Sequence, residues 1–201
     1  MKRYHGLFII FLAILIPAVG YAEIPDEIAG FKLGGFISDF RDRVNMETAM
    51  PLRYTRYIEE IETRDVAGFK NGLLWIGKCV NPGRILRIRM KYADSSKKFY
   101  EELLKRCRER FGKPAEWRGD PFHMVISWKW SFKDDQNNRI SMILEHNTRV
   151  EEETLGNTIK LTMWNLIDRE RECSEVKKAG RPLPPSKSES PPADWESLLP
   201  R

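Results

Sequence analysis

Alternating apolar and polar positions dominate the middle of the chain. Residues 73–79 and 86–92 place apolar side chains at every second position, and residues 124–132 and 139–146 repeat the pattern. Such alternation is typical of strands with one buried and one wet face. The Asn-Pro-Gly-Arg segment at 81–84 suits a type II turn, so the first two strands are predicted to form a hairpin.

The hairpin register follows from counting back from this turn. It places the apolar side chains of both strands on one face, which the rest of the fold must cover. The predicted pairs are Cys79–Leu86, Gly77–Ile88 and Trp75–Met90. Trp75 is then expected on the core side of the sheet, together with Trp128 and Trp130.

Two segments have helical spacing instead. Apolar residues recur every three or four positions through 97–111, with Ser96 as a cap and Gly112 as a stop, and residues 167–178 are also expected to be helical. The pattern as a whole predicts an α+β fold, an antiparallel sheet of about six strands with helices packed on one face. Further strands are expected at 31–33, 52–63 and 159–163, with a short helix after Ser38.

The N-terminus has the pattern of a cleavable signal peptide. Lys2 and Arg3 precede an apolar run that ends at Gly20, and Ala22 is a small residue at the expected cleavage position. An uncleaved anchor is the alternative, but the run is shorter than the roughly 20 apolar residues that span a bilayer. We therefore expect residues 1–22 to be removed and the protein to be periplasmic or secreted, with no transmembrane segment in the mature chain.

The C-terminus changes in composition. Residues 180–201 are rich in proline and serine and predict a disordered tail. A single α+β domain is then expected over 23–179. Near the end of the tail, Trp195, Leu198 and Leu199 are candidates for docking on a partner protein of the envelope.

The charge of the chain restricts the kinds of partner that we expect. Charged residues make up 31% of the chain, and loss of Lys2 and Arg3 lowers the formal net charge from +5 to +3. This mixed surface, in an exported protein, does not favour nucleic acid. Arg87, Arg89 and Lys91 form a basic stripe on the wet face of one strand and are a candidate surface for an anionic envelope component. A solvated face is the alternative interpretation.

Three cysteines remain after export, and none belongs to a CxxC motif. One disulfide and one free thiol are the simple expectation in an oxidising compartment. The helix 97–111 is expected to run back along the strand 86–92, which would bring Cys107 close to Cys79. A Cys79–Cys107 bridge is the preferred hypothesis, with Cys107–Cys173 as its rival and buried free thiols as the alternative.

No motif for catalysis, cofactor binding or metal binding stands out. The sequence lacks GxSxG and a glycine-rich phosphate loop, and two histidines in the expected mature chain are too few for a metal site. We therefore interpret the protein as a non-enzymatic binding or envelope-assembly module. The alternatives are a hydrolase or ligand-handling enzyme that uses His123 with Asp120, and a redox protein that uses the thiol of Cys173.

Two short motifs punctuate the pattern of strands and helices. They are Phe-Lys-Leu-Gly at 31–34 and Phe-Gly-Lys-Pro at 111–114. In this layout, residues 31–165 resemble small exported bacterial domains of unknown function, broadly like the periplasmic lipoprotein modules of outer-membrane assembly. The resemblance implies an exported α+β module and assigns no functional residue. Glu23 stands where such modules carry their lipid-bearing cysteine.

Overall fold

The computed structural model of the protein describes residues 23–149 and 155–180. The predicted signal peptide, 1–22, lies outside the described residues. So does the tail from residue 181 onward, including Trp195, Leu198 and Leu199.

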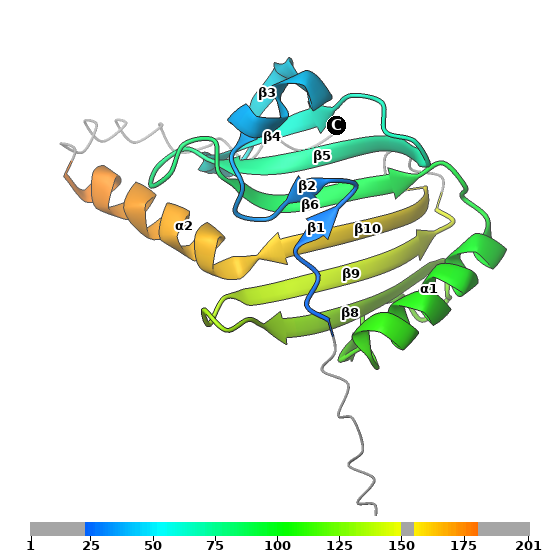
Figure 1. Ribbon diagram of the computed structural model, residues 1–201. Coiled ribbons are helices and arrows are strands. Elements are labelled where there is room, and N and C mark those ends of the chain that lie inside the picture. Colours follow the sequence, from blue (N-terminus) through cyan, green and yellow to red (C-terminus); the bar gives the residue numbers. More distant parts are fainter. Residues whose placement is uncertain (1–22, 150–154, 181–201) are drawn as a thin grey trace, which may run out of the picture.

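The fold is built around an antiparallel sheet with the strand order β3-β4-β5-β6-β10-β9-β8-β7 (Figure 1). A two-stranded hairpin, β1 with β2, lies in front of it. The strands are β1 (Glu27–Ile28), β2 (Phe31–Lys32), β3 (Val44–Leu52), β4 (Thr55–Thr63), β5 (Phe69–Gly77), β6 (Ile85–Tyr92), β7 (Glu116–Trp117), β8 (Val125–Lys133), β9 (Arg139–Asn147) and β10 (Gly156–Met163). The α+β class is confirmed.

The expected number of strands was wrong, because the main sheet has eight strands where about six were expected. The segment 52–63, expected as one strand, contains the end of β3 at Leu52, a turn and the whole of β4, and β3 pairs with β4 in a hairpin. β3 is an edge strand with mostly exposed or half-exposed side chains, so its sequence lacks the alternation of a half-buried strand. β7 has only two residues, too few to show a period.

The two long helices occupy the expected segments. Helix α1 (Lys97–Phe111) begins where the Ser96 hydroxyl accepts a hydrogen bond from the Phe99 N–H, and it ends at Gly112, whose φ is 77°. Helix α2 (Trp164–Ala179) continues directly from β10, and a short 3₁₀ segment, η1 (Ile37–Arg43), precedes β3. The β1–β2 hairpin and α1 lie over the same face of the sheet (Figure 1).

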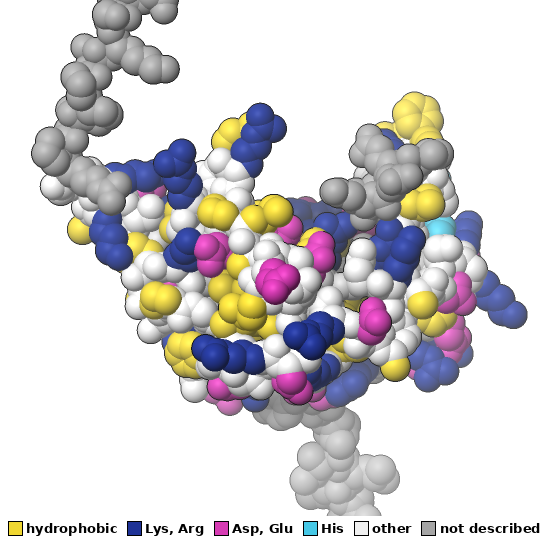
Figure 2. Space-filling view, turned by 90° about the horizontal axis from the view of Figure 1, so that it is seen from above, with side chains coloured by type: hydrophobic (Ala, Val, Ile, Leu, Met, Phe, Trp, Pro, Cys, Tyr) yellow, Lys and Arg dark blue, Asp and Glu magenta, His cyan; other side chains and the backbone are white. Residues whose placement is uncertain are grey.

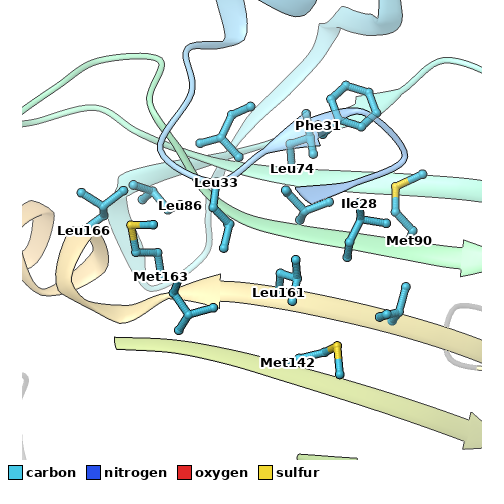
Figure 3. Packing of buried hydrophobic residues seen from close by; sticks show 14 of the residues in the cluster. Ile28, Phe31, Leu33, Leu74, Leu86, Met90, Met142, Leu161, Met163 and Leu166 are labelled. Atoms are coloured by element: carbon cyan, nitrogen blue, oxygen red, sulfur yellow. The ribbon is translucent and has the colours of Figure 1, made fainter. Parts of the chain in front are cut away.

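The hydrophobic core lies between this face and the elements that cover it. Figure 3 shows Ile28, Phe31 and Leu33 from the β1–β2 hairpin packed over side chains of the sheet strands. Leu161 of β10 and Met142 of β9 are fully buried beneath them. Because each buried side chain of this size contributes about 1.5–3 kcal/mol, this contact holds the short hairpin on the sheet.

The register of the β5–β6 hairpin differs from the expectation. The turn itself is as predicted, since Gly83 has a φ of 84° and the Arg84 N–H donates to the Asn81 carbonyl. Trp75, however, pairs with Arg87, because β5 ends at Gly77 and the ladder shifts after Trp75. The partner of Trp75 thus moves by three residues, from Met90 to Arg87, and a shift by an odd number of residues moves a side chain to the other face of a sheet. Trp75 therefore lies on the face opposite Trp130.

The predicted disulfide was also wrong. Cys79 is bonded to Cys173 of α2, with 5.9 Å between their Cα atoms, and Cys107 is a buried free thiol. Cys107–Cys173 is excluded by the same pairing. Helix α1 does not run back along β6 but lies across β9 and β8, where the Trp130 indole N–H donates to the Gly112 carbonyl. Cys107 is thus carried away from Cys79.

Candidate anion-binding site on the open face

Helices α1 and α2 and the β1–β2 hairpin contribute to a core on one face of the sheet. We call the other face the open face. Two neighbouring rows of side chains that point to it are defined by the strand pairing. The first row is Ser131, Ser141, Thr162, Arg87, Trp75 and Glu60, and the second is Lys129, Ile143, Lys160, Arg89 and Leu73.

Arg87 is held firmly in the first row. Its guanidinium carbon lies 3.5 Å from the centroid of the Trp75 ring, and its Nε donates to the Thr162 hydroxyl at 2.9 Å. The Trp75 indole N–H donates in turn to Glu60 at 2.6 Å. Burial lowers the pKa of Arg87 to about 10, although the Glu60 charge opposes this shift. The arginine stays charged at neutral pH in a partly desolvated position.

Lys160 lies beside Arg87 in the second row. Within residues 23–149 and 155–180, its ammonium group makes no hydrogen bond and no ion pair. Burial lowers its pKa, and the charge of Arg87 lowers it further. A half-buried cation without a counter-ion is costly, because the charged form loses hydration without gaining a partner.

These side chains surround a cavity of about 150 Å³ on the open face. Three cations and two carboxylates contribute to its lining, and among the cations Lys160 makes no hydrogen bond or ion pair within the described residues. The lining residues are Glu60, Trp75, Arg87, Arg89, Ile143, Glu145, Thr158 and Lys160. A cavity of this kind suits a small negatively charged group.

Only part of the predicted basic stripe therefore belongs to the candidate site. Arg87 and Arg89 line the cavity, whereas Lys91 pairs with Thr158 in the next row and is 6% exposed. Sequence reasoning missed Lys160, although its position between Ile159 and Leu161 marks it as facing away from the core. The pairing of β10 with β6, strands far apart in the sequence, could not be read from the chain.

The side chains of Asp120 and His123 do not form the pair that was predicted for a hydrolase. The Asp120 carboxylate accepts hydrogen bonds from the N–H groups of Phe122, Met124 and Val125 and from Arg149. It therefore holds the loop between β7 and β8. The His123 ring lies against Trp117, with 5.9 Å between ring centroids. This geometry leaves Asp120 as a loop-organising residue.

His146 has a structural position. It is 4% exposed, and its Nδ1 lies 2.7 Å from the Asn157 amide oxygen. The amide nitrogen of Asn157 donates to the carbonyls of Asp94 and Ser96, at the start of α1. The pair links β9 and β10 to the helix.

The cysteines do not form a reactive thiol site. Cys173, the residue expected to act in a redox protein, is oxidised in the disulfide. Burial raises the pKa of the free Cys107 thiol to about 11, so little of it is the reactive thiolate at neutral pH.

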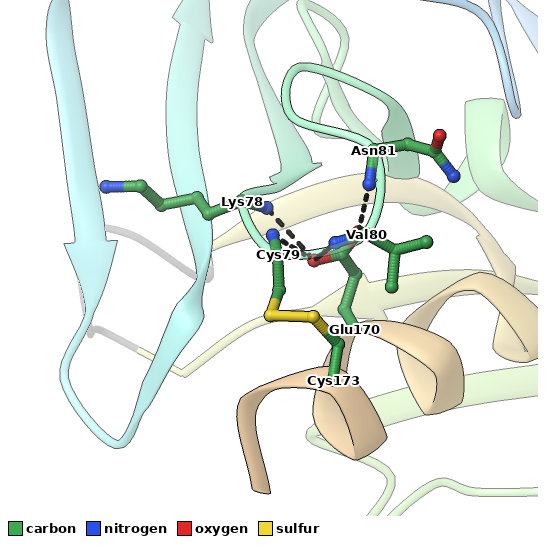
Figure 4. Close-up of a disulfide and its surroundings, with 6 residues drawn as sticks. All are labelled: Lys78, Cys79, Val80, Asn81, Glu170 and Cys173. Carbon is green, nitrogen blue, oxygen red and sulfur yellow. Dashed lines mark hydrogen bonds between the residues drawn. A yellow bond between two sulfur atoms is a disulfide. The ribbon is translucent and has the colours of Figure 1, made fainter. Parts of the chain in front are cut away.

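A buried carboxylate lies next to the disulfide. Glu170 of α2, 2% exposed, accepts hydrogen bonds from four successive backbone N–H groups in the loop after β5 (Figure 4). Successive N–H groups of this kind form a natural anion-binding nest. Here the nest is filled from within the protein, so it fixes the loop that carries Cys79 and is not open to a ligand.

Another cavity, of about 600 Å³, lies between the β1–β2 hairpin, the turn after β8 and the start of α2. Three acidic and three basic side chains contribute to its lining, namely Asp26, Asp134, Asp135, Lys32, Arg84 and Arg169. Lys32 forms an ion pair with Asp26 at 3.3 Å, and Asp134 accepts hydrogen bonds from Asn138. The formal charges of this lining therefore balance.

In the described residues, no three His, Cys, Asp or Glu side chains gather in a way that could hold a metal ion. Residues 23–149 and 155–180 also contain no helix that is long and apolar enough to cross a membrane. Comparison of the chain with protein-family models, with curated proteins and with solved structures gives no match. The interpretation of function therefore rests on the site itself.

Proposed function

We propose that the protein is an exported, non-enzymatic binding module that holds an anionic component of the cell envelope on its open face. The observation that carries this proposal is the half-buried Lys160, which lies beside Arg87 in a cavity of the open face and makes no hydrogen bond or ion pair within the described residues. An anion in this cavity would supply the missing partner.

Export is part of the proposal and has its own support. The first 22 residues have the order of a signal peptide, and a disulfide links Cys79 to Cys173. Disulfides persist in oxidising compartments and are rare in the cytosol. We expect the protein recovered from the envelope fraction to have an intact mass that begins at Glu23. A mass that retains residues 1–22 would contradict cleavage.

The mode of binding follows from how charge is distributed. Figure 2 shows basic, acidic and apolar side chains interspersed over the surface seen from above. Such a surface does not attract a polyanion along its whole length. Binding is therefore expected to depend on a local site, and to weaken with salt because exposed charges are screened.

The test is sedimentation of the purified protein with washed envelope fragments of the producing cell, at low and high salt. The variant Arg89→Gln/Lys160→Gln should bind several-fold less. The control, Lys105→Gln/Arg106→Gln, removes the same charge from exposed positions on α1 and should bind like the wild type. Equal loss in both variants, or no salt-sensitive binding at all, would rule out the open-face site.

A further inference from the structure

A groove of about 300 Å³ lies beside the disulfide, between the start of β4, the loop after β5 and the end of α2. Figure 4 shows the disulfide that joins this loop to α2. We call the groove the α2 groove. Its lining includes Arg56, Tyr57, Lys78, Cys79, Lys177 and Lys178.

The rim of the α2 groove is basic. Among the described residues, four lining side chains are basic and none is acidic. Lys78 forms an ion pair with Glu59, which lies outside the groove. The exposed side chains of Arg56, Lys177 and Lys178 make no hydrogen bond and no ion pair with residues 23–149 and 155–180. A concave surface lined by charges of one sign attracts groups of the opposite sign.

The floor of the α2 groove is less polar than its rim. Tyr57 and Cys79 lie between the charged groups, both are half-buried, and Cys79 is bonded to Cys173. Lysine and arginine side chains also cover such a surface with their aliphatic stems while the charged ends stay in water. The groove therefore suits a peptide that carries both carboxylates and apolar side chains.

The chain itself contains such a peptide, at residues 189–199. This segment has three acidic residues and no lysine or arginine. The acidic residues are Glu189, Asp194 and Glu196, and the large apolar residues are Trp195, Leu198 and Leu199. The apolar residues are spaced i, i+3 and i+4, which places them on one side of a helical turn. Charge and apolar pattern are thus complementary to the groove.

The end of α2 lies close enough for this segment to reach the groove. The helix ends at Ala179, directly after Lys177 and Lys178, which line the groove. Residues 180–188 connect the helix to the acidic segment, and a connection of that length spans up to about 30 Å when extended. A short tether also keeps the segment at an effective concentration on the order of millimolar, so a weak contact suffices.

We propose that residues 189–199 dock in the α2 groove of the same chain. The carboxylates face the basic rim, and Trp195 covers Tyr57 and Cys79. The docked segment occupies a surface that otherwise attracts anions, which leaves the open face as the surface for an anionic envelope component. This inference does not depend on the proposed function, since the α2 groove and the open-face cavity share no lining residue among the described ones.

The experiment is nuclear magnetic resonance of the full chain with a nitroxide spin label attached through Ser197→Cys. Cys107 is a buried thiol whose pKa is raised by burial to about 11, so the label attaches at position 197. The label broadens the signals of nearby amides. We expect the strongest loss of signal at residues 56–57, 78–79 and 174–178. High salt should restore most of it, because exposed charges are screened.

Two variants and one control assign this loss to the groove. Arg56→Gln/Lys177→Gln should reduce the loss of signal several-fold, and Trp195→Ser should also reduce it although every charge is kept. Lys105→Gln/Arg106→Gln is the matched control, because it removes the same charge from exposed positions on α1. The labelled control should behave like the labelled wild type.

The contrary outcomes are equally specific. A loss of signal spread evenly over the surface, or equal loss in Arg56→Gln/Lys177→Gln and in the wild type, would overturn the inference. A loss at the groove that grows with protein concentration would assign the groove to the tail of a second copy, and would overturn docking within one chain.

Discussion

Glu170 offers the sharpest prediction about stability. Its carboxylate accepts hydrogen bonds from the N–H groups of Lys78, Cys79, Val80 and Asn81, at 2.5–3.2 Å. The Glu170→Gln substitution keeps the shape of the side chain. It replaces one accepting oxygen with an NH₂ group that faces N–H donors. Some of the backbone N–H groups then lose their acceptor, and the others donate to a neutral amide oxygen in place of a charged carboxylate.

The size of the loss follows from these contacts. A hydrogen bond to a charged group contributes about 1.5–3 kcal/mol, and four such bonds set an upper limit of about 6–12 kcal/mol. The amide oxygen retains part of this, and the loop can draw on water because Val80 is 43% exposed. We therefore expect Glu170→Gln to cost about 3 kcal/mol, which lowers the melting temperature by roughly 6–12 °C in a protein of this size.

The assay is thermal and denaturant unfolding of oxidised and reduced protein, with Glu172→Gln as the control. Glu172 lies on the same helix and is exposed, so its substitution should cost less than about 0.5 kcal/mol. The Glu170→Gln loss should persist after reduction, because the carboxylate contacts the loop independently of the disulfide. A loss no larger than that of Glu172→Gln would refute the reasoning.

Three further results are expected. Gly77→Ala should destabilise the protein by about 1–3 kcal/mol in denaturant unfolding, because an added Cβ would lie 2.5 Å from a Glu170 oxygen; unchanged stability would contradict this close approach. Cys107 should resist iodoacetamide in the native protein and react once after unfolding without reductant, as mass spectrometry can show; labelling of two or three thiols would contradict the assigned disulfide. Burial raises the pKa values of Cys107, Tyr92 and Tyr100, so the unfolded state ionises first and stability falls with rising pH, above pH 9 for Cys107, whose pKa is about 11, and above pH 10 for the two tyrosines. The share of Cys107 is on the order of 2 kcal/mol, so a denaturant midpoint that falls equally in wild type and Cys107→Val would argue against it.

The parts of the fold that were predictable are those with strong local signals. β8 and β9 alternate clearly, and α1 has both a cap at Ser96 and a stop at Gly112, so their positions could be read from the chain. β3 could not be predicted, because the side chains of an edge strand with little burial need not alternate between apolar and polar.

The wrong register of the β5–β6 hairpin and the wrong disulfide partner of Cys79 have one physical cause. The chain after Gly77 leaves the ladder and wraps around Glu170, which lies about 90 residues further on, as the separations of these hydrogen bonds show. No local pattern marks that contact. It ends β5 early, turns Trp75 to the open face and brings Cys79 to Cys173.

The residues of the candidate site could also be predicted only in part. Arg87 and Arg89 were identified because their outward positions follow from the alternation of β6. Lys160 and Glu145 join them only because β10 lies between β6 and β9, which is a property of the sheet order. The charge pattern along one strand therefore identifies the site residues of that strand, whereas the site residues of other strands are identified only from the tertiary structure.

The most direct test of a binding site on the open face is a nuclear magnetic resonance titration of the isotopically labelled protein with two small anions, D-glucuronate and glycerophosphoglycerol. The account predicts saturable amide shifts in β5, β6, β9 and β10 around Trp75, Arg87 and Lys160, with little change in α1. Shifts that concentrate on the basic side chains of α1, or that scatter over the surface without saturating, would contradict it.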